Sequence, residues 1–217
     1  MRVLTWNLYH GRAVPPARRP LLNEFATALA GWPWDVALLQ EAPPWWPPAL
    51  AAAAGAQART ALTSRNQLLP LRRAIAARAP DLLGSAGGGA NAILVRGRPI
   101  LEHRVRRLRA WPERRCAHGV RLDDGWVVNV HAHHRPASRA WADDVAALAA
   151  ARAWAAGAPL IFGGDLNLAH PAFTGLRHVA GNHVDHIFTD GRDATGPAQV
   201  IDRGRLSDHP PVAVTLA

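Results

Sequence analysis

The order of apolar and polar residues along the chain predicts seven short β-strands. Each is a run of about five residues, rich in β-branched, aromatic or other apolar side chains and bounded by turn residues. The runs are residues 2–6, 35–39, 91–95, 125–130, 159–162, 184–188 and 211–216.

Helical spacing of apolar residues predicts two long helices and one short helix. Phe25 and Leu29 recur at this spacing within residues 20–31, and a second pattern runs from about residue 138 to 157. The short helix covers about residues 71–78. Few but long helices, with a hairpin-like middle from 91 to 130, favour an α+β fold over a regular βαβ repeat.

Length and composition support one globular domain over residues 1–217. The chain is 49% hydrophobic and 19% charged, which is too apolar for a disordered chain. The single cysteine, Cys116, excludes a disulfide framework and thiolate metal clusters, so any metal would be held by oxygen and nitrogen. The glycine run at 84–89 lacks the Gly-Lys-Ser/Thr ending of a nucleotide P-loop.

No run of residues is long enough to span a bilayer, so we expect no membrane span. The first residues lead directly into a predicted strand without a targeting signal, which predicts a cytoplasmic protein. We further expect a monomer.

All 25 basic residues are arginine, and they are unevenly distributed. Nine arginines and only two glutamates lie between residues 96 and 121. This segment therefore carries a net charge of +7, while the whole chain carries +9. This segment is a candidate surface for a polyanion such as nucleic acid. The alternative is a solvated, arginine-rich hairpin with no ligand.

Polar residues follow or precede the apolar strands, where side chains emerge at the edge of a sheet. They are Asn7, Glu41, His131, Asp165, Asn167, Asp185, Asp208 and His209. Taken singly, each has an ordinary explanation as a helix cap, an Asx turn or a surface residue. Together, the oxygens of Glu41, Asp208 and Asn7 would suit a hard divalent cation, most naturally Mg²⁺, with Mn²⁺ as the substitute.

Alternating histidines at 131, 133 and 134 could also indicate a zinc site. The chain lacks the aspartate–histidine pair that would follow in a binuclear zinc hydrolase. Structural or rim positions are therefore expected for His133 and His134.

Six short motifs follow one another along the chain. They are Thr-Trp-Asn-Leu, Leu-Leu-Gln-Glu, Asn-Val-His, Gly-Asp-Leu-Asn, Asp-His-Ile and Ser-Asp-His-Pro, from residue 5 to residue 210. In this order the chain resembles the endonuclease/exonuclease/phosphatase superfamily. The resemblance implies a four-layer α/β/β/α sandwich of two mostly antiparallel sheets, with the site at the strand ends on one rim.

The resemblance also implies a role for each motif residue. Glu41 would be the principal metal ligand, assisted by Asn7 and Asp208. Asp165 and Asn167 would position or deprotonate the attacking water, and His131 and His209, the latter oriented by Asp185, would contact the phosphate. Whether Asp165 or His209 takes the proton of the water stays open.

Substrate contacts are less specific in the sequence. Arg115 resembles the phosphate-contacting arginine of the superfamily, although Arg114 fits equally well, and Asn91 is expected to face the cleft. Tyr9 and His131 depart from the abasic-site endonuclease pattern, which favours the deoxyribonuclease-like or phosphatase-like branches.

These features predict a Mg²⁺-dependent phosphoesterase that acts on phosphodiester bonds, with nucleic acid as the first substrate candidate. The alternatives are a small-molecule or lipid-headgroup phosphodiesterase or phosphatase and, less favoured, a non-catalytic polyanion-binding module. The loop at 43–48 holds Trp45 and Trp46 close to Glu41. These indoles either stack on a base or sugar or cover the helix beneath them.

Overall fold

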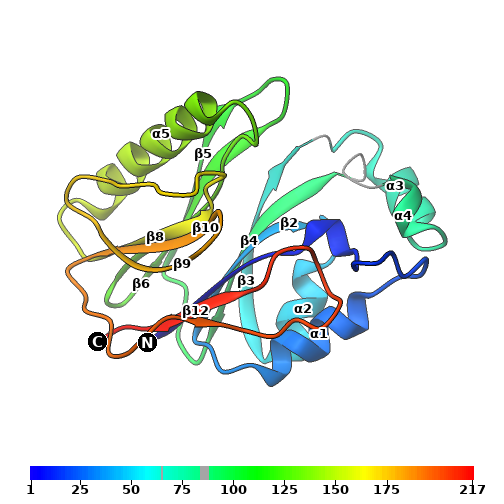
Figure 1. Ribbon diagram of the computed structural model, residues 1–217, viewed down its shortest axis with the longest axis horizontal. Helices are drawn as coiled ribbons and strands as arrows, with labels where there is room; N and C mark the ends of the chain where they lie inside the picture. The colour runs from blue at the N-terminus through cyan, green and yellow to red at the C-terminus, as the bar shows by residue number, and fades with distance from the viewer. Residues whose placement is uncertain (65, 84–87) are drawn as a thin grey trace.

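The computed structural model describes residues 1–64, 66–83 and 88–217, so most of the glycine run at 84–89 lies outside it. The described chain forms two six-stranded sheets that pack face to face, with helices on the outer face of each (Figure 1). The four-layer α+β sandwich is therefore confirmed.

The first sheet has the order β11-β12-β1-β2-β4-β3. Its strands are β1 (Arg2–Asn7), β2 (Val36–Ala42), β3 (Ala56–Thr63), β4 (Gly89–Arg96), β11 (Gln199–Val200) and β12 (Val212–Thr215). The central pair, β1 and β2, is parallel, and the other neighbours are antiparallel. Helix α1 (Leu22–Gly31) connects the parallel pair.

The second sheet repeats this plan in the order β5-β6-β7-β8-β10-β9. Its strands are β5 (Glu102–Arg109), β6 (Arg115–Leu122), β7 (Gly125–His131), β8 (Leu160–Asp165), β9 (Arg177–Asn182) and β10 (Asp185–Asp190). Its central parallel pair is β7 and β8, connected by helix α5 (Ala137–Ala155).

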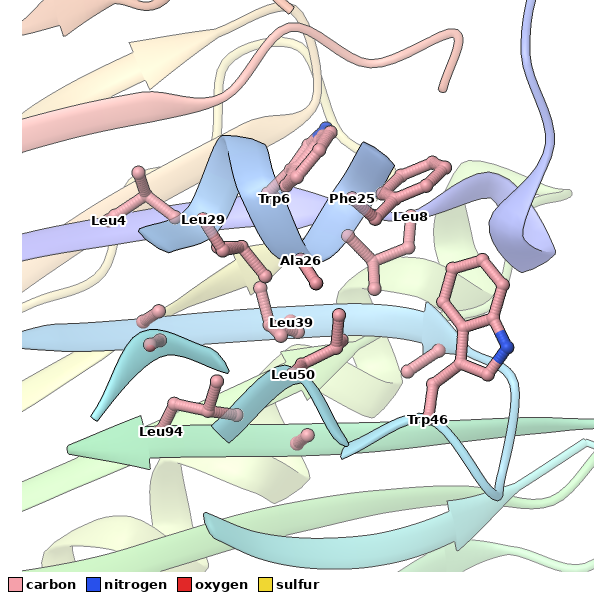
Figure 2. Packing of buried hydrophobic residues seen from close by; sticks show 14 of the residues in the cluster. Leu4, Trp6, Leu8, Phe25, Ala26, Leu29, Leu39, Trp46, Leu50 and Leu94 are labelled. Carbon is pink, nitrogen blue, oxygen red and sulfur yellow. The ribbon is translucent and has the colours of Figure 1, made fainter. Parts of the chain in front are cut away.

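Three apolar layers hold the sandwich together. The first lies between the first sheet and helices α1 and α2 (Pro47–Ala54), the second between the sheets, and the third under α5. Figure 2 shows Trp46 within the first layer, where its ring lies 5.3 Å from that of Phe25. Trp46 therefore packs on the helices, which agrees with the second of the two interpretations given for the tryptophan loop.

All seven predicted strands are present, but five others were not predicted: β3, β5, β6, β9 and β11. Strand β5 is a largely exposed edge strand, so few of its side chains need to be apolar. Its sequence therefore has the composition of a charged loop, which is why the strand was not predicted. The predicted hairpin-like middle is only partly right. Strands β5, β6 and β7 are consecutive antiparallel neighbours, whereas β4 belongs to the other sheet.

Among the helices, the short one spans Leu69–Ala76 (α3), two residues earlier than predicted, and is followed by α4 (Pro80–Leu83). The alanine-rich run after Trp46 forms α2, which was not predicted. Within the described ranges, no helix has the length and hydropathy needed to cross a membrane.

The two ends of the chain meet on the first sheet. Strand β12 pairs with β1, and the amino group of Met1 donates a 2.7 Å hydrogen bond to the carbonyl of Leu216. The C-terminal strands therefore return to the sheet in which the chain began.

A buried amide joins the two sheets below the strand ends. Asn129 of β7 accepts a 2.8 Å hydrogen bond from Gln40 Nε2 and donates to the carbonyls of Leu39 and Ala92 at 2.9 and 3.0 Å. These contacts tie β7 to β2 and β4. They fix how one sheet lies on the other.

Replacing Asn129 by leucine should lower the free energy of unfolding by about 3 kcal/mol, because it leaves buried polar partners unsatisfied. Urea denaturation measures the loss. The matched change Asn23→Leu, on the exposed side of α1, should cost less than about 0.5 kcal/mol. A loss below about 1 kcal/mol for Asn129→Leu would show that the amide is not needed to join the sheets.

Candidate active site

The carboxyl ends of both parallel pairs meet at one rim of the sandwich. Asn7 ends β1 and Glu41 lies near the end of β2, while His131 and Asp165 end β7 and β8. Antiparallel neighbours complete the group, since Asp185 starts β10 opposite Asp165 and residues 207–209 lead into β12. Side chains from both sheets thus converge.

A polar pocket of about 260 Å³ lies at this rim, and we call it the catalytic pocket after the role that we propose for it. It is lined by Asn7, Tyr9, His10, Arg12, Glu41, Glu113, Arg115, His131, His134, Asp165, Asn167, Asp208 and His209. Eight of these were named as site candidates from the sequence. The structure brings them together although they are spread over two hundred positions.

The backbone around the pocket is strained. Tyr9, His10, Glu41, Asn167 and Ser207 all have positive φ angles, between 49° and 63°. Glu41 also lies in an irregularity where the pairing of β2 with β4 shifts register. Strained residues persist where the surroundings hold them, and they gather at functional sites.

His209 and Asp185 form a closely coupled pair. His209 Nδ1 lies 2.7 Å from Asp185 Oδ2. Burial alone would lower the pKa of His209, but the hydrogen bond to Asp185 and the nearby carboxylates raise it to about 9. Burial raises the pKa of the Asp185 carboxyl, while the contact with His209 lowers it. Since imidazole is the stronger base, the proton resides on His209.

Asp165 is held in a fixed orientation by its neighbours. It is 2% exposed and accepts hydrogen bonds from Asn7 Nδ2 at 2.8 Å and from the backbone N–H of Asn167 at 3.1 Å. His131 Nε2 lies 3.7 Å and His209 Nε2 4.0 Å from its Oδ2 atom. Asp165 therefore lies between the two imidazoles.

His131 is fixed in one tautomer. Arg115 Nη1 lies 3.0 Å from His131 Nδ1, and because a guanidinium only donates, Nδ1 must accept. Burial lowers the pKa of His131 well below its ordinary value, and the charge of Arg115 lowers it further. The ring is therefore neutral, and its Nε2–H points toward Glu41 and Asp165, with 3.7 Å between the heavy atoms.

Replacing Arg115 by methionine should lower kcat about 10- to 100-fold, because His131 loses the contact that fixes its tautomer. The matched variant is Arg114→Met, since Arg114 is exposed and does not line the catalytic pocket. It should stay within about twofold of the unaltered protein on bis(p-nitrophenyl) phosphate. Equal effects of the two changes would contradict a positioning role for Arg115.

The oxygen atoms of the pocket fit a hard divalent cation. Glu41 projects its carboxylate into the pocket with its side chain 21% exposed, and Asp208 and the Asn7 amide line the same space. His10 Nε2 lies 3.1 Å from Glu41 Oε2, and His10 Nδ1 lies 3.0 Å from the carbonyl of Gly88. Glu41, Asp208 and Asn7 are the residues that could hold the ion.

A second group, Asp165, Asp185 and His209, also has ligand-type atoms within 4.8 Å of one another. Its histidine carries a proton at neutral pH and is bonded to Asp185. An imidazolium repels a cation, so this group could take a metal only after losing that proton.

Not every candidate from the sequence lies in the pocket. Asp185 is buried behind His209, Arg114 is exposed outside the pocket, and Asn91 is fully buried in β4. Within the described chain, neither polar atom of the Asn91 side chain has a hydrogen-bond partner. Of the two candidate arginines, only Arg115 lines the pocket.

Sequence reasoning missed Arg12 entirely. Arg12 follows the short turn η1 (Tyr9–Gly11) and lies over the Tyr9 ring, 3.8 Å from its centroid. Its position after the Asn7 motif was the one available signal. Glu113 was also missed, and it binds Arg115 Nη2 at 2.7 Å. Cys116 is buried, and burial raises its pKa to about 12, so its thiol stays protonated.

The sequence matches a known protein family over most of its length. A family model described as Endonuclease/Exonuclease/phosphatase family matches residues 4–209. The comparison with curated proteins finds no match.

Solved structures with the same fold cover nearly the whole chain. An endonuclease/exonuclease/phosphatase from Bacteroides vulgatus superposes with a TM-score of 0.75 at 13% identity, covering 100% of this chain and 98% of its own. Truncated Caenorhabditis elegans TDP2 gives 0.69 at 15% identity, with 99% and 96% covered. The mannosyl-6-phosphatase of Bacteroides thetaiotaomicron gives 0.68 at 16% identity, with 100% and 99% covered.

The family model spans every strand end that contributes to the catalytic pocket, and the likeness in fold extends over the full chain. The chain therefore belongs to the Endonuclease/Exonuclease/phosphatase family, hydrolases of phosphate esters that generally depend on a divalent metal.

Proposed function

We propose that the protein hydrolyses phosphodiester bonds by attack of an activated water, with Mg²⁺ as its metal and Mn²⁺ as a substitute. One observation carries the proposal: the catalytic pocket combines the oxygen donors of Glu41, Asp208 and Asn7 with the protonated His209–Asp185 pair. When bound, the ion would neutralise charge on the phosphate oxygens and stabilise the leaving oxygen.

The protonation of His209 assigns the remaining roles. A ring that is protonated at neutral pH cannot accept a proton from water, so Asp165 acts as the base. Asn167 holds Asp165 in place through its backbone N–H. His209 and His131 then donate hydrogen bonds to the phosphate oxygens as negative charge develops.

The two arginines that line the pocket have different roles. Arg115 is 3% exposed and bonded to His131 and Glu113, so it positions His131, while Arg12 is the pocket cation that can reach a phosphate. Asn91 lies outside the pocket. We assign it no direct contact with substrate.

Support for nucleic acid as the substrate comes from part of the basic segment 96–121. Six of its nine arginines are bonded to acidic or carbonyl groups or to His131 within the described chain. No such partner is present in the described chain for the other three, Arg106, Arg107 and Arg114. Strand pairing places Arg107 opposite Cys116, the residue that follows Arg115 of the pocket. These three could contact the phosphates of a longer substrate.

A small phosphate ester is the second substrate candidate. It is favoured by an apolar cavity beside the catalytic pocket, described in the next section. It is also supported by the name of one fold neighbour, a mannosyl-6-phosphatase.

The test is cleavage of plasmid DNA, single-stranded DNA, bis(p-nitrophenyl) phosphate and p-nitrophenyl phosphate. We expect diester cleavage with Mg²⁺ or Mn²⁺, its loss in EDTA and its return with excess metal. Cleavage that EDTA leaves unchanged, or turnover of the monoester alone, would refute the proposal. Salt-sensitive DNA binding without turnover would instead indicate a non-catalytic polyanion-binding module.

The proposal takes the protein to be a monomer that acts in the cytoplasm. All the proposed catalytic groups come from one chain, so no second copy is needed to complete the pocket. Size-exclusion chromatography with light scattering, and cell fractionation, would check the two statements.

A further inference from the structure

An apolar cavity adjoins the catalytic pocket, and its volume is about 230 Å³. Its walls come from the turn after β1, the Pro43–Trp46 loop, and helices α3 and α4. Helix α4 is tied to the chain after η1 by a 2.8 Å hydrogen bond from the backbone of Arg18 to Asp81. In Figure 1 these two helices lie at the right, beside the blue segment that follows η1 and outside the four layers.

The two spaces have opposite chemical character and one common wall. Of the thirteen described residues that line the apolar cavity, only His10 and Arg73 carry a charged or titratable side chain. His10 is also the one described residue that lines both spaces. A molecule that reaches from one space into the other therefore passes His10, next to Glu41.

The cavity wall is built into the fold. Trp46 belongs to the apolar core, and a Cβ atom at Gly11 would lie only 2.3 Å from its ring. Gly11 also has a φ of +76°, which a glycine adopts without strain. The turn after β1 thus rests directly on the indole, and prolines on both sides of Trp45 and Trp46 stiffen the loop.

We infer that the apolar cavity binds the apolar group of a phosphoester whose phosphate lies in the catalytic pocket. This group is an aryl or alkyl chain of roughly six to eight carbons, since a dry cavity of about 150 Å³ already holds benzene. The inference rests on the proposed function, because it takes the catalytic pocket as the phosphate site.

A nucleobase fits this cavity less well. A base carries several donors and acceptors, which cost free energy when they are buried without partners. Both ring nitrogens of His10 are already directed at Gly88 and Glu41. The other polar side chains of the described lining, Arg73 and the two indoles, only donate hydrogen bonds, so the N–H groups of a base would find no side-chain acceptor among them. An apolar group has no such requirement.

The test uses alkylphosphonates, whose carbon–phosphorus bond the proposed reaction does not cleave. Isothermal titration calorimetry with Mg²⁺ compares methyl-, butyl- and hexylphosphonate. We expect the Kd to fall about two- to fourfold per buried methylene group, so that hexylphosphonate, with five more carbons, binds at least about 30-fold more tightly than methylphosphonate.

Two variants on one helix separate cavity filling from general effects. Ala76→Phe places a ring in the cavity, whereas Ala74→Phe changes an exposed position of α3 that does not line it. Ala76→Phe should reduce the advantage of hexylphosphonate below about fivefold and leave methylphosphonate binding unchanged. Ala74→Phe should leave both values unchanged, and thermal melts confirm that both variants fold.

The inference is overturned if chain length has no effect on Kd, or if both variants act alike. It is also overturned if phosphonomethoxyethyl adenine binds more tightly than hexylphosphonate and loses this affinity in Ala76→Phe, since the cavity would then accept a base. Methylphosphonate reports on the phosphate site alone. Absence of its binding, together with absence of metal-dependent cleavage, would instead count against the proposed function.

Discussion

Replacing Asp185 by asparagine should lower kcat by about 10³-fold and move the alkaline limb of its pH profile from about pH 9 toward neutral pH. Asp185 holds His209 in its protonated form. Without the Asp185 carboxylate, burial lowers the pKa of the ring and only the charges of Asp165 and Asp208 still oppose this, so the phosphate loses much of its charged donor as pH approaches the neutral range. Exchange of the orienting aspartate in a Ser-His-Asp triad costs about 10⁴-fold, so a loss of about 10³-fold is within the range of such effects.

The sign of the pH effect follows from the direction of the pKa shift. A raised pKa keeps the ring charged at neutral pH, and activity is then lost as pH rises through about 9. Initial rates on bis(p-nitrophenyl) phosphate between pH 6 and 10 measure the limb. Asp190→Asn, at the exposed far end of the same strand, is the matched control and should change neither value. If the alkaline limb stayed near pH 9 in Asp185→Asn, protonated His209 would have no part in the mechanism.

Exchange of Glu41 for glutamine should raise the Mg²⁺ concentration needed for half-maximal rate at least about 100-fold. The amide keeps the shape of the side chain but removes the negative charge that Mg²⁺ requires of its ligands. Loss of groups that only support metal ligands already costs 10- to 100-fold, so loss of a direct ligand should cost at least as much.

Metal binding by calorimetry gives a second measurement that does not depend on turnover. Glu24→Gln, in α1 and outside the catalytic pocket, should bind Mg²⁺ as the unaltered chain does. If Glu41→Gln kept its affinity for Mg²⁺, the ion would have to be held elsewhere. The group of Asp165, Asp185 and His209 would then be the place to examine.

The interior strands could be predicted because layers on both faces require nearly continuous apolar runs, as in β2 and β8. The four edge strands, β3, β5, β9 and β11, have no such requirement, and β6 is rich in small and polar residues although it is buried. Their existence depends on pairing partners far away in the chain. A local pattern cannot supply that information.

The candidate site could be predicted to the extent that its residues end strands. Asn7, His131 and Asp165 directly end apolar runs, and the ends of parallel strands meet. The choice between Arg114 and Arg115 depends on the register of β6 against β5, which contains an irregularity there. His10 and Arg12 reach the pocket through a left-handed turn, which alternation along a strand does not describe.

The contact between the two chain ends has a consequence for topology. Because Met1 and Leu216 are hydrogen-bonded neighbours, a short linker could join them, and the chain could be reopened at exposed Gly97, between β4 and β5. In such a circular permutant, β5 to β10 would form one sheet, and β11, β12 and then β1 to β4 would form the other. The molecule is thus equivalent to two six-stranded halves in tandem, with the proposed catalytic pocket at the seam between them.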